Sequence, residues 1–311
     1  LRNTHHINVK SSQTQALRNM GYYHGFKGYR FIREDTNRVN FSSLDEIIAL
    51  NKYDMRLKTV LYPKVMFIEN ALKSYVIEAL LADSKSENFD VIYNKSLTAY
   101  RNYTPGSRAY KTEYTKRMNL KGKINAALVR DYNKRSVVAH FFNNDITIPV
   151  WAIFETLALG EFGTLYDCAC TNVKLYVSNI MKLPTNLDSD GMNTKFFIFT
   201  VKDLRNAIAH NNVIFDTRFK DRKISPVLKK WVEKETGIQN ITLYSLIDYI
   251  IIVCCLLKRV DFSGTRALTL LNKYKEENQR LQNSVASEIY DHIIQNNVPA
   301  KVVGLEAYLN V

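Results

Sequence analysis

The sequence contains few residues that interrupt a helix, with 11 glycines and 6 prolines among 311 residues. The long segments between them repeat apolar residues at helical spacing, which favours an all-α fold over a sheet. Residues 44–51 are predicted to form a short helix, and a longer helix, bent at Pro63, is predicted to begin at Met55. A hydrophobic content of 46% can fill a substantial core and excludes a disordered chain.

Cysteine is also scarce, and the four cysteines show no spacing that is typical of a zinc site. They occur as Cys168-x-Cys170 and Cys254-Cys255, and no histidine accompanies either pair. We therefore expect no metal and no other cofactor. The cysteines are interpreted as buried free thiols of a protein in a reducing cytoplasm.

No apolar run in the sequence is long enough to cross a membrane. The longest, residues 243–257, is shorter than the roughly 20 residues that a span requires, and it contains Asp248. The first residues also lack the charged and apolar regions of a signal peptide. These features predict a cytoplasmic protein in which residues 243–257 form a buried helix of a bundle.

Positive charge, by contrast, is in excess. The chain has 43 lysines and arginines against 30 acidic residues, which gives a net charge of +13. Such a surface attracts polyanions. An anionic membrane is disfavoured because the sequence has no polybasic amphipathic helix or lipidation signal, and DNA because it has no helix-turn-helix pattern. RNA is the expected partner.

The residues with the clearest chemistry are Arg205 and His210, five positions apart in a segment that reads as a helix. At about 3.6 residues per turn, both side chains can reach one groove. Histidine exchanges a proton near neutral pH, and arginine carries a permanent charge suited to phosphate. Because RNA supplies its own nucleophile, the ribose 2′-hydroxyl, this pair could cleave RNA without a metal. Asn206 is predicted to orient the pair, since an amide does not titrate.

The same Arg-x4-His spacing occurs at Arg135 and His140, so spacing alone is weak support for a site. The second match lacks the asparagine that follows Arg205 and runs into a predicted helix end, so we expect it to be structural. A structural alternative also exists for the first match, in which Arg205 pairs with an acidic residue and His210 lies in the core. Glu69 could be that acidic partner, orienting Arg205 from a facing helix.

Residues 83–122 alternate tyrosines with basic residues and are predicted to form an RNA-binding insertion. Aromatic rings stack on unpaired bases while cations follow the phosphate backbone. The expected contacts are Arg101, Arg108, Lys111, Arg117, Tyr100 and Tyr103. A second basic stretch adds Arg218, Lys220 and Arg222. The alternative for residues 83–122 is a solvated helical hairpin whose tyrosines fill packing gaps.

Four separated blocks of the chain resemble, in order, those of one protein group. The blocks are Tyr22-Tyr23-x5-Tyr29, Phe67-Ile68-Glu69-Asn70-Ala71-Leu72, Pro149-x-Trp151 with Glu155-x-Leu157 and Gly160, and Leu204-Arg205-Asn206-x3-His210-Asn211. Together they resemble the AbiD/AbiF group of bacterial abortive-infection proteins, within the HEPN superfamily of helical ribonucleases. His24 and Phe26 depart from the first block of that group.

The resemblance implies a HEPN-type helical bundle with endoribonuclease activity and a toxin or anti-phage role, restrained in some relatives by a structured noncoding RNA. It also implies a homodimer, because one histidine cannot easily serve as both base and acid and relatives face two motifs across a two-fold interface. Arg205 and His210 match the catalytic pair. Glu69 and Asn211 are further candidates for supporting residues, and for Glu69 a surface role is an equal alternative.

Three consecutive parts are expected along the chain. They are an N-terminal segment with the tyrosine block (1–54), a HEPN-like domain with the insertion at about 83–122 (55–264), and a helical C-terminal extension (265–311). The predicted function is that of a metal-independent endoribonuclease toxin in an abortive-infection or toxin-antitoxin system. The alternative is a non-catalytic HEPN module that holds a regulatory RNA.

Overall fold

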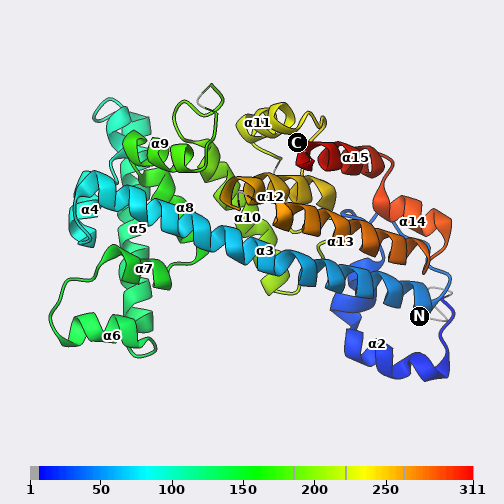
Figure 1. The fold of residues 1–311 in the computed structure, drawn as a ribbon. Coiled ribbons are helices and arrows are strands. Elements are labelled where there is room, and N and C mark those ends of the chain that lie inside the picture. Colours follow the sequence, from blue (N-terminus) through cyan, green and yellow to red (C-terminus); the bar gives the residue numbers. More distant parts are fainter. Residues whose placement is uncertain (1–6, 185, 221–222, 262, 311) are drawn as a thin grey trace. The chain divides into compact units, whose positions relative to one another are not determined.

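The computed structural model describes residues 7–184, 186–220, 223–261 and 263–310, and this part of the chain consists of helices joined by loops (Figure 1). Within these ranges, β pairing is limited to isolated bridges such as the one between Asn8 and Ser43. The all-α prediction is therefore confirmed. None of the described helices is both long and apolar enough to cross a membrane.

The chain divides into two compact units. The first contains residues 1–68 and 203–311, and the second contains residues 69–202. Helices α3 (Leu44–Ser84) and α10 (Asn193–Ala209) contribute residues to both. Described residues from the N-terminal and C-terminal parts of the chain thus belong to the same unit. The three consecutive parts expected from the sequence stay a prediction.

Helix α12 (Leu246–Val260) forms the centre of the first unit, and nearly all its side chains are buried. It packs against helices contributed by the C-terminal third of the chain, α11 (Pro226–Thr236), α13 (Thr265–Gln282) and α15 (Val298–Leu309). Figure 1 shows α12 and α13 side by side. A helix that is apolar on all sides needs neighbours on all sides. The residues predicted as an extension therefore complete the core.

Asp248, the charge inside this apolar helix, is fully buried and has several partners. Its Oδ2 accepts hydrogen bonds from the backbone N–H groups of Thr242 and Leu243, each at 2.9 Å. Its Oδ1 lies 2.6 Å from Nζ of Lys301 on α15, which also donates to the carbonyl of Asn240. A buried carboxylate is tolerated when its charge and lone pairs are compensated, and α15 supplies the compensating cation.

The first unit also contains N-terminal elements, namely α2 (Thr14–Met20), a π-helical turn (Tyr22–Lys27) and the first part of α3. The hydroxyl of Tyr53 donates to Oδ1 of Asn278 on α13 at 2.6 Å. His292 on α14 (Ser287–Ile294) lies 2.7 Å from Oδ1 of Asn37. These contacts join segments more than 200 residues apart in the sequence.

Helix α3 is one continuous helix that passes through Pro63, whereas the sequence predicted two helices. Leu61 and Val65, on either side of the proline, are both buried. Their burial offsets the roughly 3 kcal/mol that a proline inside a helix costs. Glu46 in the first turn of the helix fixes the two residues that precede it, because its Oε2 accepts from the N–H groups of Ser42 and Ser43.

The second unit is built around the long helix α5 (Arg108–Tyr132), which packs against α6 (Ser136–Asn143), α7 (Val150–Thr156) and α8 (Leu159–Cys168). It also contains α4 (Phe89–Lys95) and α9 (Thr171–Ile180). Residues 83–122, predicted as an insertion, form α4, a 3-10 turn (Ala99–Asn102) and the first half of α5.

The four cysteines are free thiols, as predicted, and three of them are buried while Cys170 is half-buried. Burial raises the pKa of the Cys168 thiol to about 12.

Candidate active site

Arg205, Asn206 and His210 lie at the C-terminal end of α10. The backbone N–H of His210 donates to the carbonyl of Asn206 at 2.9 Å, and the turn that follows Ala209 includes Asn211, which has a φ of 54°. Asparagine tolerates this left-handed conformation better than most residues, and it commonly ends helices. The chain turns there, so His210 belongs to the turn that ends the helix.

The three side chains of the motif differ in burial. Arg205 and Asn206 are half-buried, and His210 is exposed. Leu204 and Ala207, on the opposite side of the same helix, are buried and hold it in the first unit. His210 is therefore not a core histidine, and its imidazole is accessible to solvent or to a bound substrate.

Asn206 contacts the arginine directly. Nη1 of Arg205 donates to the side-chain Oδ1 of Asn206 at 3.1 Å. The amide thus holds the guanidinium from a neighbouring position on the helix, which is compatible with the orienting role predicted for Asn206.

The turn after His210 is anchored to α3 by a buried ion pair that the sequence did not suggest as part of the site. Nζ of Lys58 donates to Oδ1 of Asn211 at 2.9 Å and lies 2.7 Å from Oδ2 of Asp54. Asp54 is fully buried and Lys58 is only 6% exposed. The pair therefore joins the helix end that carries the motif to a helix from the beginning of the chain.

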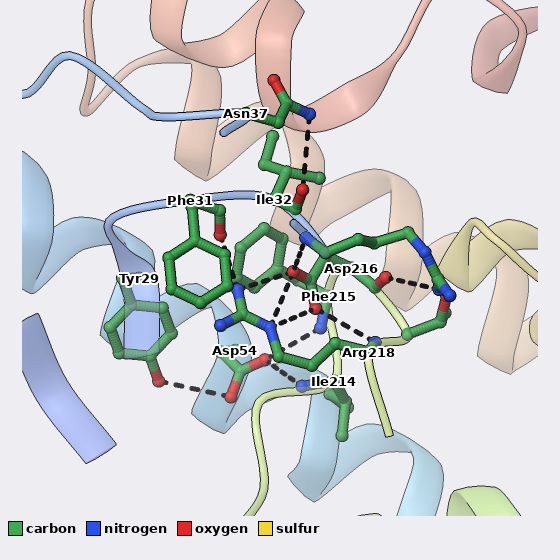
Figure 2. Close-up of polar contacts among 11 residues, drawn as sticks. Tyr29, Phe31, Ile32, Asn37, Asp54, Ile214, Phe215, Asp216 and Arg218 are labelled. Atoms are coloured by element: carbon green, nitrogen blue, oxygen red, sulfur yellow. Dashed lines mark hydrogen bonds and ion pairs between the residues drawn. The ribbon is translucent and has the colours of Figure 1, made fainter. Parts of the chain in front are cut away.

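Asp54 also binds the backbone that leaves the turn. Its Oδ1 accepts from the N–H groups of Ile214 and Phe215 at 2.8 and 3.0 Å, and the hydroxyl of Tyr29 donates to Oδ2 at 3.3 Å (Figure 2). Burial raises the pKa of the Asp54 carboxyl, while Lys58 and the two backbone donors act in the opposite direction. Four donors surround this carboxylate, and the two backbone N–H groups among them hold residues 214 and 215 in place.

Sequence reasoning missed Asp54 and Lys58, although one signal was available. They are four positions apart on a helix whose neighbouring residues Tyr53 and Leu57 are apolar and buried. An i,i+4 ion pair within an apolar face indicates a buried pair, but its contacts to residues 211–215 cannot be deduced from that spacing.

The basic stretch after the motif is largely occupied by internal contacts. Arg218 pairs with Asp216 at 2.6 Å, donates to the carbonyl of Phe31 and lies 4.3 Å from the centre of its ring (Figure 2). Lys220 lies 3.7 Å from Asp203. Arg222 is outside the described residues. Arg218 therefore holds the chain after the motif through these contacts, and a role in RNA binding stays a prediction.

Two of the RNA contacts predicted between residues 83 and 122 lie in the interior of the second unit. Arg117 is 5% exposed, with its guanidinium 3.6 Å from the ring centre of Tyr93, and Nη2 donates to the carbonyl of that residue at 2.7 Å. Tyr100 is also buried and packs edge-on against Tyr114. For these two side chains the structure favours the packing alternative, because a buried ring cannot stack on a base.

The remaining predicted contacts of that segment are exposed, namely Arg101, Arg108, Lys111 and Tyr103. They lie on the 3-10 turn, on the loop that follows it and on the first turn of α5. Of the contacts predicted in this segment, this smaller set offers charge and an aromatic ring to solvent.

Glu69 and the second Arg-x4-His match have contacts of their own within the second unit. Glu69 is buried and lies 3.0 Å from Nζ of Lys73. Its orienting role beside Arg205 stays a prediction. Arg135 pairs with Asp131 at 3.2 Å, and the exposed His140 packs edge-on against Phe141. Among the described residues, no group of three or more His, Cys, Asp or Glu side chains could hold a metal ion.

Comparison with known proteins gives one match. The family model described as Abi-like protein matches residues 15–216, about two thirds of the chain, and this range contains Tyr29, Asp54, Lys58 and the Arg205–His210 motif. No curated protein and no solved structure matches the chain.

Proposed function

Because the chain belongs to the Abi-like family of abortive-infection proteins, we propose that it is a metal-independent endoribonuclease toxin of the HEPN superfamily, related to the AbiD/AbiF group and acting in the cytoplasm. The observation that carries this proposal is the helix end at which an exposed histidine follows a half-buried arginine held by an amide. A toxin that cleaves RNA stops growth of the infected cell, which fits an abortive-infection role.

The proposed chemistry uses the substrate's own nucleophile. His210 moves the proton of the ribose 2′-hydroxyl or of the leaving 5′-oxygen, since imidazole titrates near neutral pH. Arg205 places a fixed positive charge against the non-bridging oxygens of the phosphate, where negative charge grows in the transition state. The products are a 2′,3′-cyclic phosphate and a 5′-hydroxyl.

A homodimer would complete this chemistry. One imidazole cannot easily accept one proton and donate another in the same step, and the chain has a single convincing motif. Two copies related by a two-fold axis would supply two histidines to a composite cleft. A structured noncoding RNA antitoxin is the proposed restraint.

The proposed reaction is tested by the dependence of cleavage on metal ions and by the chemistry of the ends. We expect end-labelled RNA to be cut in the presence of EDTA. The 5′ fragments should end in a 2′,3′-cyclic phosphate, which is detected by its sensitivity to acid and to an enzyme that removes cyclic phosphates. Strict dependence on magnesium, or 3′-hydroxyl ends, would contradict the mechanism. Tight RNA binding without any cleavage would instead favour the alternative, a non-catalytic module that holds a regulatory RNA.

RNA binding is expected to use the exposed cations of the second unit. Replacing Arg101, Arg108 and Lys111 together by alanine should flatten the dependence of log Kd on log salt by up to about 2, since each lost phosphate contact removes roughly 0.7 for single strands. Tyr103→Ala should weaken unpaired RNA more than duplex, because stacking needs an exposed base. Filter binding over a salt series measures both effects.

The control for this experiment removes the same charge elsewhere. Alanine at Lys273, Lys275 and Arg280, exposed residues of α13, lowers the net charge equally. An equal salt slope for both triple variants would mean that RNA does not use the surface formed by Arg101, Arg108 and Lys111.

A further inference from the structure

The side-chain amide of Asn211 has a defined orientation. An ammonium group can only donate hydrogen bonds, so the atom of Asn211 that faces Nζ of Lys58 at 2.9 Å is the carbonyl oxygen. The NH2 group lies at the other end of the amide. Since Lys58 is buried and Asn211 is exposed, solvent reaches the NH2 end.

This orientation is held firmly, because Lys58 cannot move without breaking buried contacts. Its ammonium lies 2.7 Å from Asp54, which in turn binds the backbone of Ile214 and Phe215. Rotating the amide of Asn211 by half a turn would set its N–H groups against the ammonium. That arrangement leaves a buried cation facing donors and is unfavourable.

The backbone at Asn211 narrows the choice of residue at this position. A φ of 54° is adopted readily by glycine and asparagine, but at a cost by most other residues. Glycine would end the helix equally well but carries no amide. Asparagine therefore combines the turn conformation with a donor next to His210.

We propose that Asn211 is a further catalytic residue, whose Nδ2 donates a hydrogen bond to a non-bridging oxygen of the phosphate that Arg205 and His210 act upon. Lys58 and Asp54 are positioning residues that direct this donor. The inference rests on the proposed function, since it concerns the same phosphate. Donors that are fixed before the reaction stabilise developing charge without reorganisation, so the bond contributes most in the transition state.

Two substitutions of Asn211 distinguish the role of its side-chain amide from the role of its backbone conformation in the turn. Asn211→Asp keeps the oxygen that faces Lys58 but replaces the NH2 with a second oxygen that repels phosphate. Asn211→Gly keeps the backbone conformation but removes the amide. We expect both to lower kcat by about 10- to 100-fold, as for loss of a hydrogen bond to a charged group. Hydrogen exchange at the amides of Ile214 and Phe215 should stay near the parental rate in the aspartate variant.

Asn212→Asp is the matched control, because it adds the same charge at an adjacent exposed residue, whereas the hydrogen bond of Lys58 goes to Asn211. It should change kcat far less than Asn211→Asp. Parental kcat in Asn211→Asp, or an equal loss in Asn212→Asp, would overturn the catalytic role of the amide.

The positioning role is tested by a double-mutant cycle. Asp54→Asn with Lys58→Met removes both buried charges and keeps an oxygen for the backbone donors. If Lys58 acts through the amide of Asn211, adding Asn211→Gly to this background should cost little more in kcat, whereas a merely structural role predicts independent losses. Additive losses would overturn the positioning role.

Binding of an uncleavable RNA separates this inference from the proposed function. With RNA that carries a 2′-deoxyribose at the cleavage site, the Nδ2 protons of Asn211 should shift in the NMR spectrum of the parent protein. If these NMR signals shift but the protein never cleaves normal RNA, the contact between Asn211 and phosphate is supported and the proposed ribonuclease activity is contradicted. An unchanged Asn211 signal in a cleaving enzyme would overturn the contact alone.

Discussion

Alanine at Arg205 or at His210 is expected to lower RNA cleavage by about 100- to 10,000-fold, the range for losing a general acid–base or a transition-state cation. Growth inhibition in cells should disappear together with RNA cleavage. Both residues lie at a helix end where His210 is exposed and Arg205 half-buried, so neither holds the core. Thermal unfolding and light scattering should therefore show parental stability and the same oligomeric state. Single-turnover cleavage of labelled RNA gives the size of the effect.

Arg135→Ala and His140→Ala are the matched controls for this prediction, because they alter the same residue types at the same spacing. Arg135 pairs with Asp131 and His140 packs against Phe141, so both variants should retain most of the activity. Loss of cleavage in these variants, with the first pair dispensable, would move the active site to α6.

Lys301→Met is expected to destabilise the first unit by about 3–5 kcal/mol, the range for breaking a buried ion pair. Lys301 and Asp248 lie 2.6 Å apart, and their side chains are 5% and 0% exposed. Methionine fills most of the volume of lysine but leaves the carboxylate of Asp248 buried without its cation. Urea unfolding followed by circular dichroism measures the free energy of unfolding.

Two further variants test that explanation. Combining Lys301→Met with Asp248→Asn should recover part of the loss, since the amide oxygen still accepts from Thr242 and Leu243 but carries no charge. Lys275→Met removes an exposed pair between α13 and α15, with Glu306 at 2.9 Å, and should cost far less because solvent screens it. Equal losses at Lys275 and Lys301 would show that burial of the pair does not set its contribution.

Local patterns determined several features of this protein without any structure. The scarcity of glycine and proline and the helical spacing of apolar residues sufficed for the all-α class, since helix formation depends on residues three and four positions apart. The apolar run around Asp248 was correctly predicted as a buried helix rather than a membrane span. The ordered blocks identified the abortive-infection family, while the catalytic role of Arg205 and His210 stays a prediction.

Tertiary structure alone decided which polar residues lie inside. Arg117 and Tyr100 belong to the same tyrosine-rich basic segment as Arg101 and Tyr103. The first two are nevertheless buried in a tyrosine cluster, whereas the last two face solvent. The anchor of the turn after the Arg205–His210 motif likewise joins Lys58 to Asn211, 153 positions apart, and α15 completes a core begun at α12. Such pairings follow from how helices pack, and the spacing of residues along the chain carries no information about partners that far away.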